Sequence, residues 1–146
     1  MIREATSADI PRIIEMGSRS LLEGPYKDHL ADKPEVTTAL AKDLLSRPNA
    51  VILVVDEAFK LCGVFAFIIF PHYYSGEIVA GEIIWYVEPE SRKSGAGLEL
   101  LWDAENRARN LGAKKMQLAA PTDEIAAMYG KLRGYHKIET SFQRSL

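Results

Sequence analysis

The chain has 146 residues, of which 47% are hydrophobic and 26% charged, and its formal net charge is −2. These values are typical of a soluble globular protein and predict one domain, residues 1–146, large enough to bury a core. Since no block of Lys or Arg is present, we expect no nucleic-acid partner.

The longest apolar run, residues 63–71, is too short to span a bilayer, and the charged N-terminus does not resemble a signal peptide. We therefore expect a cytoplasmic protein without a membrane partner.

The first third of the chain predicts one short strand and two helices. Residues 1–5 are typical of a strand, and a helix is expected over about 7–22, with one apolar face formed by Ile10, Ile13, Ile14, Gly17 and Leu21. Residues 22–35 are polar and rich in turn formers, which predicts a connection. A second helix should follow and end near Pro48.

The middle of the chain predicts three strands. Residues 50–56 are mostly β-branched, residues 57–60 are typical of a hairpin turn, and residues 61–70 and 78–88 are again apolar. All three segments are apolar enough to lie centrally in a sheet that is covered on both faces. The single cysteine, Cys62, is expected to be a buried strand residue and excludes a disulfide within the chain.

The last third predicts helix, strand, helix and strand. A helix over 95–111 should bury Leu101, Ala104, Ala108 and Leu111, followed by a strand near 114–120, a helix over 122–133 capped by Thr122, and strand propensity over 135–146. Both tryptophans, Trp85 and Trp102, are expected in the core. The element order predicts an α/β domain whose sheet combines hairpins with helical crossovers.

The stretch "RKSGAG", residues 92–97, lies where the third central strand leads into a helix. Glycines at a helix N-terminus let an anion approach the free backbone N–H groups, so this is either a phosphate cradle or an ordinary turn. A dinucleotide fingerprint is excluded because Leu100 stands at its third glycine position, and no Gly-Lys-Ser/Thr follows as a triphosphate loop would require.

In its wider context this stretch resembles the GCN5-related N-acetyltransferase (GNAT) family. "RKSGAG" is similar to the family's pyrophosphate loop, "WYVEPESR" to its central strand, "MYGKLRGY" to its later helix and "IREATSADIPRI" to its opening strand and helix. The similar segments occur in the family's order and cover nearly the whole chain.

The resemblance implies a fold, a cosubstrate and the residues that bind it. The fold is a single α/β domain with a mixed, mostly antiparallel sheet, splayed in the middle and flanked by about four helices. The cosubstrate is acetyl-coenzyme A, held at the pyrophosphate and along the pantetheine arm by residues matching the family's pattern: Tyr86, Val87, Arg92, Lys93, Ser94, Gly95, Ala96, Gly97 and Leu98.

Glu82 is the predicted catalytic base. It interrupts an apolar run, where a carboxylate must either face a cleft or be buried, and burial would raise its pKa toward the value a base needs. Some members of the family carry a catalytic glutamate at this place. The alternative is an exposed glutamate on an irregular strand edge. Glu77 and Glu88 are weaker candidates because both are expected in exposed turns.

Tyr129 is the predicted general acid, a role that the resemblance implies for the departing thiolate. The local pattern allows a second interpretation, because Ile125, Met128, Tyr129 and Leu132 have the spacing of a buried helix face. One departure from the family is Thr122, which stands where an asparagine that contacts coenzyme A is common.

The resulting expectation is an acetyl-coenzyme A-dependent N-acetyltransferase that acts on a primary amine of a small molecule or a protein. Four acidic residues of the polar connection could line a pocket for a cationic acceptor or simply be solvated: Glu23, Asp28, Asp32 and Glu35. No metal is expected, because the histidines lack ligand spacing. The resemblance also allows a homodimer. The alternative function is a non-catalytic coenzyme A-binding module that serves in regulation or interaction.

Overall fold

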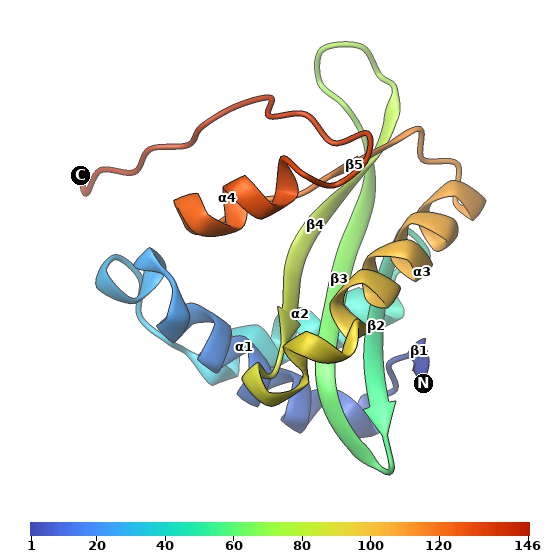
Figure 1. Cartoon of the computed structure of the whole chain (residues 1–146), viewed down its shortest axis with the longest axis vertical. Coiled ribbons are helices and arrows are strands. Elements are labelled where there is room, and N and C mark those ends of the chain that lie inside the picture. Colours follow the sequence, from blue (N-terminus) through green and yellow to red (C-terminus); the bar gives the residue numbers. More distant parts are fainter.

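The computed structural model describes residues 1–146 and forms one five-stranded sheet with helices on both faces (Figure 1). The α-helices and strands follow one another as β1 (Ile2–Glu4), α1 (Ile10–Glu23), α2 (Pro34–Ser46), β2 (Ala50–Glu57), β3 (Lys60–Pro71), β4 (Ile78–Val87), α3 (Ala96–Asn110), β5 (Lys115–Gln117) and α4 (Asp123–Tyr129). Short 3₁₀ turns occur at Ser7–Asp9, Pro25–Asp28 and Pro89–Ser94. None of the helices has the combination of length and apolar character that crossing a bilayer requires.

The sheet has the strand order β1-β2-β3-β4-β5. The first three pairings are antiparallel and the pairing of β4 with β5 is parallel. This confirms the predicted α/β class and the mixed, mostly antiparallel sheet. The parallel pair follows from the chain path, since α3 crosses from the end of β4 back to the start of β5.

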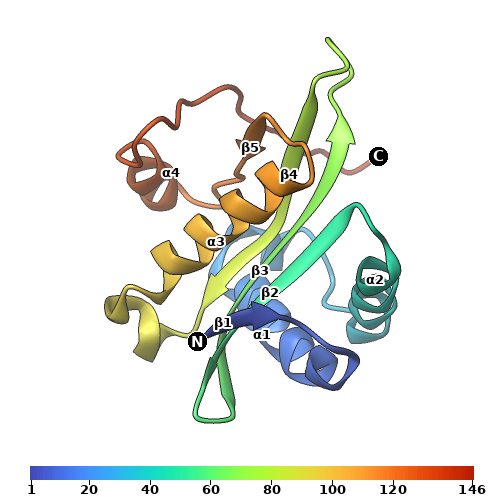
Figure 2. The same ribbon diagram turned by 90° about the vertical axis from the view of Figure 1, so that its right-hand side faces the viewer.

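Helices lie on both sides of the sheet (Figure 2), and each face carries a buried hydrophobic cluster, as predicted from the continuous apolar character of β2, β3 and β4. One buried cluster joins the sheet to α3, which contributes Leu100, Leu101, Ala104 and Ala108. The other joins the opposite face to α1 and α2 through residues such as Ile10, Met16 and Leu44. Alternate side chains of one strand therefore enter opposite clusters.

Some elements differ from the expectation. The strand expected over 135–146 is wrong: residues 136–146 form no helix or strand, and Ile138 and Phe142 are exposed there because no strand edge pairs with the segment. Leu111, Trp102 and Met128 are also exposed rather than buried. Leu111 lies just beyond the last turn of α3, and Leu100, which the pattern did not include, is fully buried.

Candidate active site

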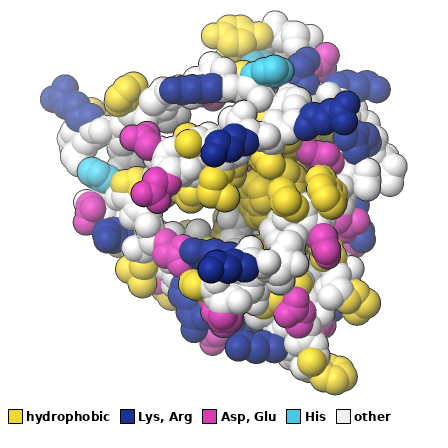
Figure 3. All heavy atoms as spheres, in the orientation of Figure 1, with side chains coloured by type: hydrophobic (Ala, Val, Ile, Leu, Met, Phe, Trp, Pro, Cys, Tyr) yellow, Lys and Arg dark blue, Asp and Glu magenta, His cyan; other side chains and the backbone are white.

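The site begins where β4 and β5 separate. The two strands pair only between Val79–Gly81 of β4 and Lys115–Gln117 of β5. Beyond Gly81, β4 continues to Val87 with no strand on that side, so its backbone N–H and C=O groups face an open edge. This is the splayed middle that the resemblance implied. Figure 3 shows the surface hollowed between the parts of the chain that carry α1 and α4, beside a group of hydrophobic side chains.

A β-bulge in β4 sets the direction of the side chains at this edge. Phe67 of β3 is opposite Glu82, but its neighbour Ala66 is opposite Ile84, so Ile83 is the extra residue. In a regular strand, residues 82 and 85 would point to opposite faces. The bulge instead directs Glu82 and Trp85 to the same face, the one covered by α3.

Glu82 lies half-buried on this face, as its interruption of an apolar run predicted. One carboxylate oxygen accepts a hydrogen bond of 2.9 Å from the N–H of Ala119, in the segment between β5 and α4. Burial raises the pKa of the Glu82 carboxyl from 4.5 to about 7, although the hydrogen bond from Ala119 lowers it. The group is therefore poised to gain or lose a proton near neutral pH.

Tyr129, the last residue of α4, lies against the same face. Its ring stacks on Trp85 with centroids 5.2 Å apart and an interplanar angle of 16°. Burial raises the pKa of the Tyr129 phenol, and the charge of Glu82 raises it further. The hydroxyl makes no hydrogen bond within the protein and stays protonated at neutral pH. The expectation that Tyr129 lies with Met128 on one buried face is wrong, since Met128 is exposed.

The position of α4 follows from contacts at both of its ends. Thr122 caps the helix as predicted, its hydroxyl accepting a hydrogen bond of 3.2 Å from the N–H of Ile125. After the helix, the hydroxyl of Tyr135 donates a bond of 2.7 Å to Glu105 of α3. The cap acts within α4, whereas the Tyr135–Glu105 bond and the bond from Ala119 to Glu82 attach the chain on both sides of the helix to α3 and β4.

The β4–α3 loop, residues 88–95, lies at the other end of this edge. It ends at Gly95, whose φ of 90° is a left-handed conformation that favours glycine, and α3 begins at the next residue. The N–H of Leu98 donates to the Gly95 carbonyl and that of Ala96 to the Ser94 hydroxyl, at 3.0 and 3.3 Å. A Cβ added at Gly97 would meet no atom closer than 3.7 Å. A side chain as small as alanine would therefore make ordinary contacts with Val87 and Trp85 at this position.

The two basic residues of the loop differ in their contacts. The Arg92 guanidinium pairs with Glu23 at the end of α1, at 2.6 Å, and its Nε donates to the Val87 carbonyl at 2.9 Å. It also lies over the Tyr86 ring, 5.5 Å from the centroid. Lys93 is exposed. Lys93 is therefore free to meet an anion, whereas Arg92 already ties the loop to α1.

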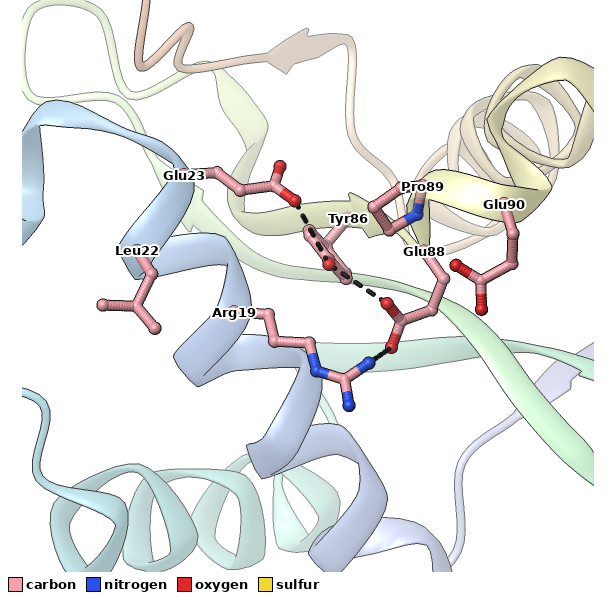
Figure 4. A pocket seen from close by; sticks show the side chains of 7 residues that line it. All are labelled: Arg19, Leu22, Glu23, Tyr86, Glu88, Pro89 and Glu90. Atoms are coloured by element: carbon pink, nitrogen blue, oxygen red, sulfur yellow. Dashed lines mark hydrogen bonds and ion pairs between the residues drawn. The ribbon is translucent and has the colours of Figure 1, made fainter.

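A pocket of about 360 Å³ lies between the end of α1 and the end of β4. It is lined by Arg19, Leu22, Glu23, Tyr86, Glu88, Pro89 and Glu90 (Figure 4). Glu88, which the sequence placed in an exposed turn, is only 1% exposed. That expectation is wrong because the Glu88 side chain turns inward to meet two arginines of α1.

The acidic residues of the α1–α2 connection do not gather into one site. Glu23 is paired with Arg92, and Asp28, Asp32 and Glu35 are exposed. The solvated interpretation of these three residues is the one that fits. Glu77, the other weak candidate for a base, forms an ion pair with Lys115 at the sheet edge.

Taken together, the open edge of β4 connects an anion-compatible helix N-terminus to a half-buried carboxylate and a protonated phenol. A helix N-terminus that suits an anion, at one end of an open strand edge that carries two titratable side chains, is compatible with a group-transfer enzyme. The sequence profile of the acetyltransferase (GNAT) family matches residues 18–135. The chain therefore belongs to the GNAT family of N-acetyltransferases, whose members use acetyl-coenzyme A.

Solved structures share this fold over the whole chain. An acetyltransferase from Trypanosoma brucei is 21% identical, with a TM-score of 0.76, and covers 100% of this chain and 99% of its own. An aminoglycoside antibiotic 6'-N-acetyltransferase from Acinetobacter haemolyticus is 19% identical, with a TM-score of 0.78 and coverage of 100% and 97%. A second such enzyme, from Acinetobacter baumannii, is 18% identical, with a TM-score of 0.77 and coverage of 100% and 98%. No curated protein sequence matches the chain.

The residues present fit a coenzyme A molecule. The helix start at Gly95, where an added Cβ would meet no atom within 4 Å, and the exposed Lys93 suit a diphosphate, and the unpaired edge of β4 from Glu82 to Val87 suits an extended amide-containing arm. Tyr86 and Val87, predicted to contact that arm, bury their side chains, so only their backbone groups face the edge.

Trp85 packs against the core cluster as expected, but its stacking on Tyr129 and the burial of Glu88 were not predicted. Trp85 is half-buried between the start of α3 and α4, next to Gly97 and stacked on Tyr129. The local sequence contains no signal for the bulge that directs it, because a strand buried on both faces has no alternation that an extra residue would interrupt.

Proposed function

We propose that the protein transfers the acetyl group of acetyl-coenzyme A directly to a primary amine of a small molecule or a protein, within the single domain of residues 1–146. The observation that carries the proposal is the convergence of Glu82 and Tyr129 on one face of the splayed strand. The donor thioester supplies the acetyl group.

The β4–α3 loop and the first turn of α3 bind the diphosphate of the donor in this proposal. The backbone N–H groups from Arg92 to Leu98 lie toward the diphosphate in this proposal, with the positive end of the 15-residue helix α3. The N–H groups of Ala96 and Leu98 and the Ser94 hydroxyl already donate hydrogen bonds within the loop, so they share these bonds with the ligand. The N–H of Gly97 makes no such bond and is the donor that the proposal relies on most. Lys93 adds charge from solvent, whereas Arg92 fixes the loop through Glu23 and Val87. The open edge at Tyr86 and Val87 binds the pantetheine arm.

Glu82 serves as the base. An amine with a pKa near that of lysine, about 10.4, is only about 0.04% neutral at pH 7, so removal of its proton is part of the barrier. A carboxylate with a pKa of about 7 can accept that proton, directly or through a water molecule, as the nitrogen attacks the acetyl carbon.

Tyr129 serves as the acid on the other side of the reaction. As the carbon–sulfur bond breaks, negative charge develops on sulfur, and the Tyr129 hydroxyl is available to donate to it because it has no acceptor in the protein. A thiol has a pKa of about 8.5, so the phenol is the weaker acid and donates its hydrogen bond as charge develops rather than before. Stacking on Trp85 fixes the ring.

The acceptor is best sought with a panel of amines. Two structural neighbours are aminoglycoside 6'-N-acetyltransferases, which supports including aminoglycosides beside polyamines, amino acids and lysine peptides. Release of the coenzyme thiol reports turnover with any member of the panel, and mass spectrometry locates the added acetyl group.

The decisive comparison uses wild type, Glu82→Gln and Tyr129→Phe. The proposal expects turnover by wild type with at least one amine, and loss of turnover in both variants while acetyl-coenzyme A still binds by calorimetry. A wild-type protein that binds the coenzyme but acetylates nothing, with both variants unchanged in every property, would instead be a non-catalytic coenzyme A-binding module.

A further inference from the structure

Glu88, the first residue of the β4–α3 loop, is a buried carboxylate that the chemistry of acetyl transfer does not use. One of its oxygens accepts hydrogen bonds of 2.7 Å from Arg12 and from Arg19, both on α1. The other accepts a bond of 3.2 Å from the hydroxyl of Tyr86 on β4. Figure 4 shows Arg19 and Tyr86 converging on this carboxylate. Its side chain therefore joins α1 to the end of β4.

This arrangement keeps Glu88 charged in an environment that would otherwise neutralise it. Burial alone raises the pKa of the carboxyl, but the hydrogen bond and charge of Arg19, with smaller contributions from Tyr86 and Arg12, lower it below its usual value. A buried ion pair is often no more stabilising than apolar side chains of similar volume. Stability alone therefore does not account for a charge at this place.

The backbone of Glu88 is held as firmly as its side chain. Its N–H donates to the Cys62 carbonyl of β3 at 2.8 Å, and its carbonyl accepts from the N–H of Ser91 at 2.9 Å. Arg92, four residues further along, donates to the carbonyl of Val87, the residue before Glu88. The loop thus starts from a point attached to α1, β3 and β4 at once.

A second set of contacts connects Tyr86 to the far end of the β4–α3 loop through Glu23 of α1. The Tyr86 hydroxyl lies 3.4 Å from Glu23, and Glu23 pairs with Arg92 in the loop. Glu88, Tyr86, Glu23 and Arg92 thus form a chain of contacts that begins and ends in the β4–α3 loop. A shift of the Glu88 carboxylate would therefore be transmitted to both ends of the loop.

We propose that Glu88 is a positioning residue for the coenzyme: by anchoring Arg12 and Arg19 of α1 to the start of the β4–α3 loop, it holds the loop amides in the geometry that binds the diphosphate. Glu88 itself touches neither donor nor acceptor. The inference rests on the proposed function, since it needs acetyl-coenzyme A at this loop.

The direction in which one substitution changes the affinity for acetyl-coenzyme A distinguishes a positioning role of Glu88 from a purely electrostatic effect. Glu88→Gln removes a negative charge close to an anion site and leaves Arg19 without its ion-pair partner, while Arg12 keeps its pair with Glu15. If charge alone mattered, acetyl-coenzyme A would bind more tightly and with a steeper dependence on salt. If Glu88 positions the loop, binding weakens, because a displaced loop loses hydrogen bonds to the diphosphate.

The test measures the Kd of acetyl-coenzyme A by isothermal titration calorimetry and needs no acceptor. The matched control is Asp9→Asn, since Asp9 is the other buried carboxylate, 8% exposed, and pairs with Arg3 at the start of the chain. We expect Glu88→Gln to raise the Kd about tenfold, the size of effect that a small misplacement of binding groups produces, and Asp9→Asn to leave it within about twofold. Both variants should lower the melting temperature.

Once an acceptor is known, the same variants give a second readout. Glu88→Gln should raise the KM for acetyl-coenzyme A and leave kcat nearly unchanged, which general loss of stability would not do. If Glu88→Gln does not fold, the Kd of acetyl-coenzyme A is measured with Arg19→Gln instead, which removes the other partner of the same ion pair. Because the Arg19 side chain is 52% exposed, the fold should tolerate its replacement better. A raised Kd in that variant supports the inference and an unchanged one overturns it.

Three results overturn the inference: a Kd for Glu88→Gln that is unchanged, a Kd that is lower than that of wild type, or equal weakening by Asp9→Asn. Failure of wild type to bind acetyl-coenzyme A is a different result, because it overturns the proposed function itself.

Discussion

Replacing Gly97 by alanine should separate the stability of the fold from its capacity to bind the coenzyme. The added Cβ would lie 3.7 Å from Cγ2 of Val87 and 3.9 Å from Nε1 of Trp85, which are ordinary contact distances. Gly97 lies in the first turn of α3 and is not among the glycines with positive φ. Alanine should therefore stabilise the helix by about 0.5–1 kcal/mol relative to glycine. For a domain of this size, that gain raises Tm by about 1–4 °C.

The same methyl group should weaken the coenzyme complex. The methyl group is attached to a residue of the first turn of α3, and a phosphate oxygen must come within about 2.9 Å of a backbone nitrogen of that turn to accept its hydrogen bond. Loss of one hydrogen bond to a charged group costs about 1.5–3 kcal/mol. The Kd of acetyl-coenzyme A should therefore rise about 10- to 100-fold.

Thermal unfolding and calorimetry measure the two effects on the same samples. Gly95→Ala is the matched control: its φ of 90° makes alanine unfavourable, and no atom lies within 4 Å of the added Cβ. That variant should lose about 1–2 kcal/mol of stability. A clear fall of Tm in Gly97→Ala would refute the packing argument. An unchanged Kd would show that the diphosphate does not bind at this loop.

Three further predictions concern the reacting end of the site. Tyr129→Phe keeps the stack on Trp85, so Tm and the Kd of acetyl-coenzyme A should not change, while turnover falls about 100-fold or more in thiol-release assays; unchanged turnover would exclude Tyr129 as the acid. Glu82→Gln should be more stable than wild type at pH 8 by about 1–3 kcal/mol in urea denaturation, because it removes a half-buried charge. Since the folded pKa of about 7 exceeds the model-peptide value of 4.5, wild type loses stability as pH rises between these values, and the advantage of the variant should vanish toward pH 4.5; an advantage independent of pH would contradict this origin. Trp85 is half-buried beside Gly97, whereas Trp102 is 58% exposed. Acetyl-coenzyme A should therefore change the tryptophan fluorescence of Trp102→Phe, which keeps Trp85, but not that of Trp85→Phe, which keeps Trp102; the reverse result would contradict binding beside Trp85.

The fold was largely predictable because the spacing of apolar residues and the residues that begin or end helices depend on the local sequence. The run of apolar residues in β2, β3 and β4 identified strands buried on both faces, and the hydroxyl of Thr122 caps α4 as expected. The segment over 135–146 was not predictable in this way. Its strand propensity has effect only where another strand offers an edge, and that depends on tertiary structure.

The site was predictable only in part. Glu82 could be singled out because a carboxylate in an apolar run is costly unless the structure uses it. Its position on the same face as Trp85 depends on a bulge at Ile83, for which local propensity gives no rule. Glu88 was misplaced because its burial depends on Arg12 and Arg19, which are distant in the sequence and reach it only in the folded chain.

The most direct test of the central claim is the pH dependence of kcat/KM for acetyl transfer by wild type and Glu82→Gln. With Glu82 as the base, kcat/KM of wild type should rise with pH and level off above an apparent pKa of about 7. The variant should have a much lower kcat/KM without this inflection. A wild-type profile in which the inflection near pH 7 persists after the Glu82→Gln substitution would contradict the assignment of the base.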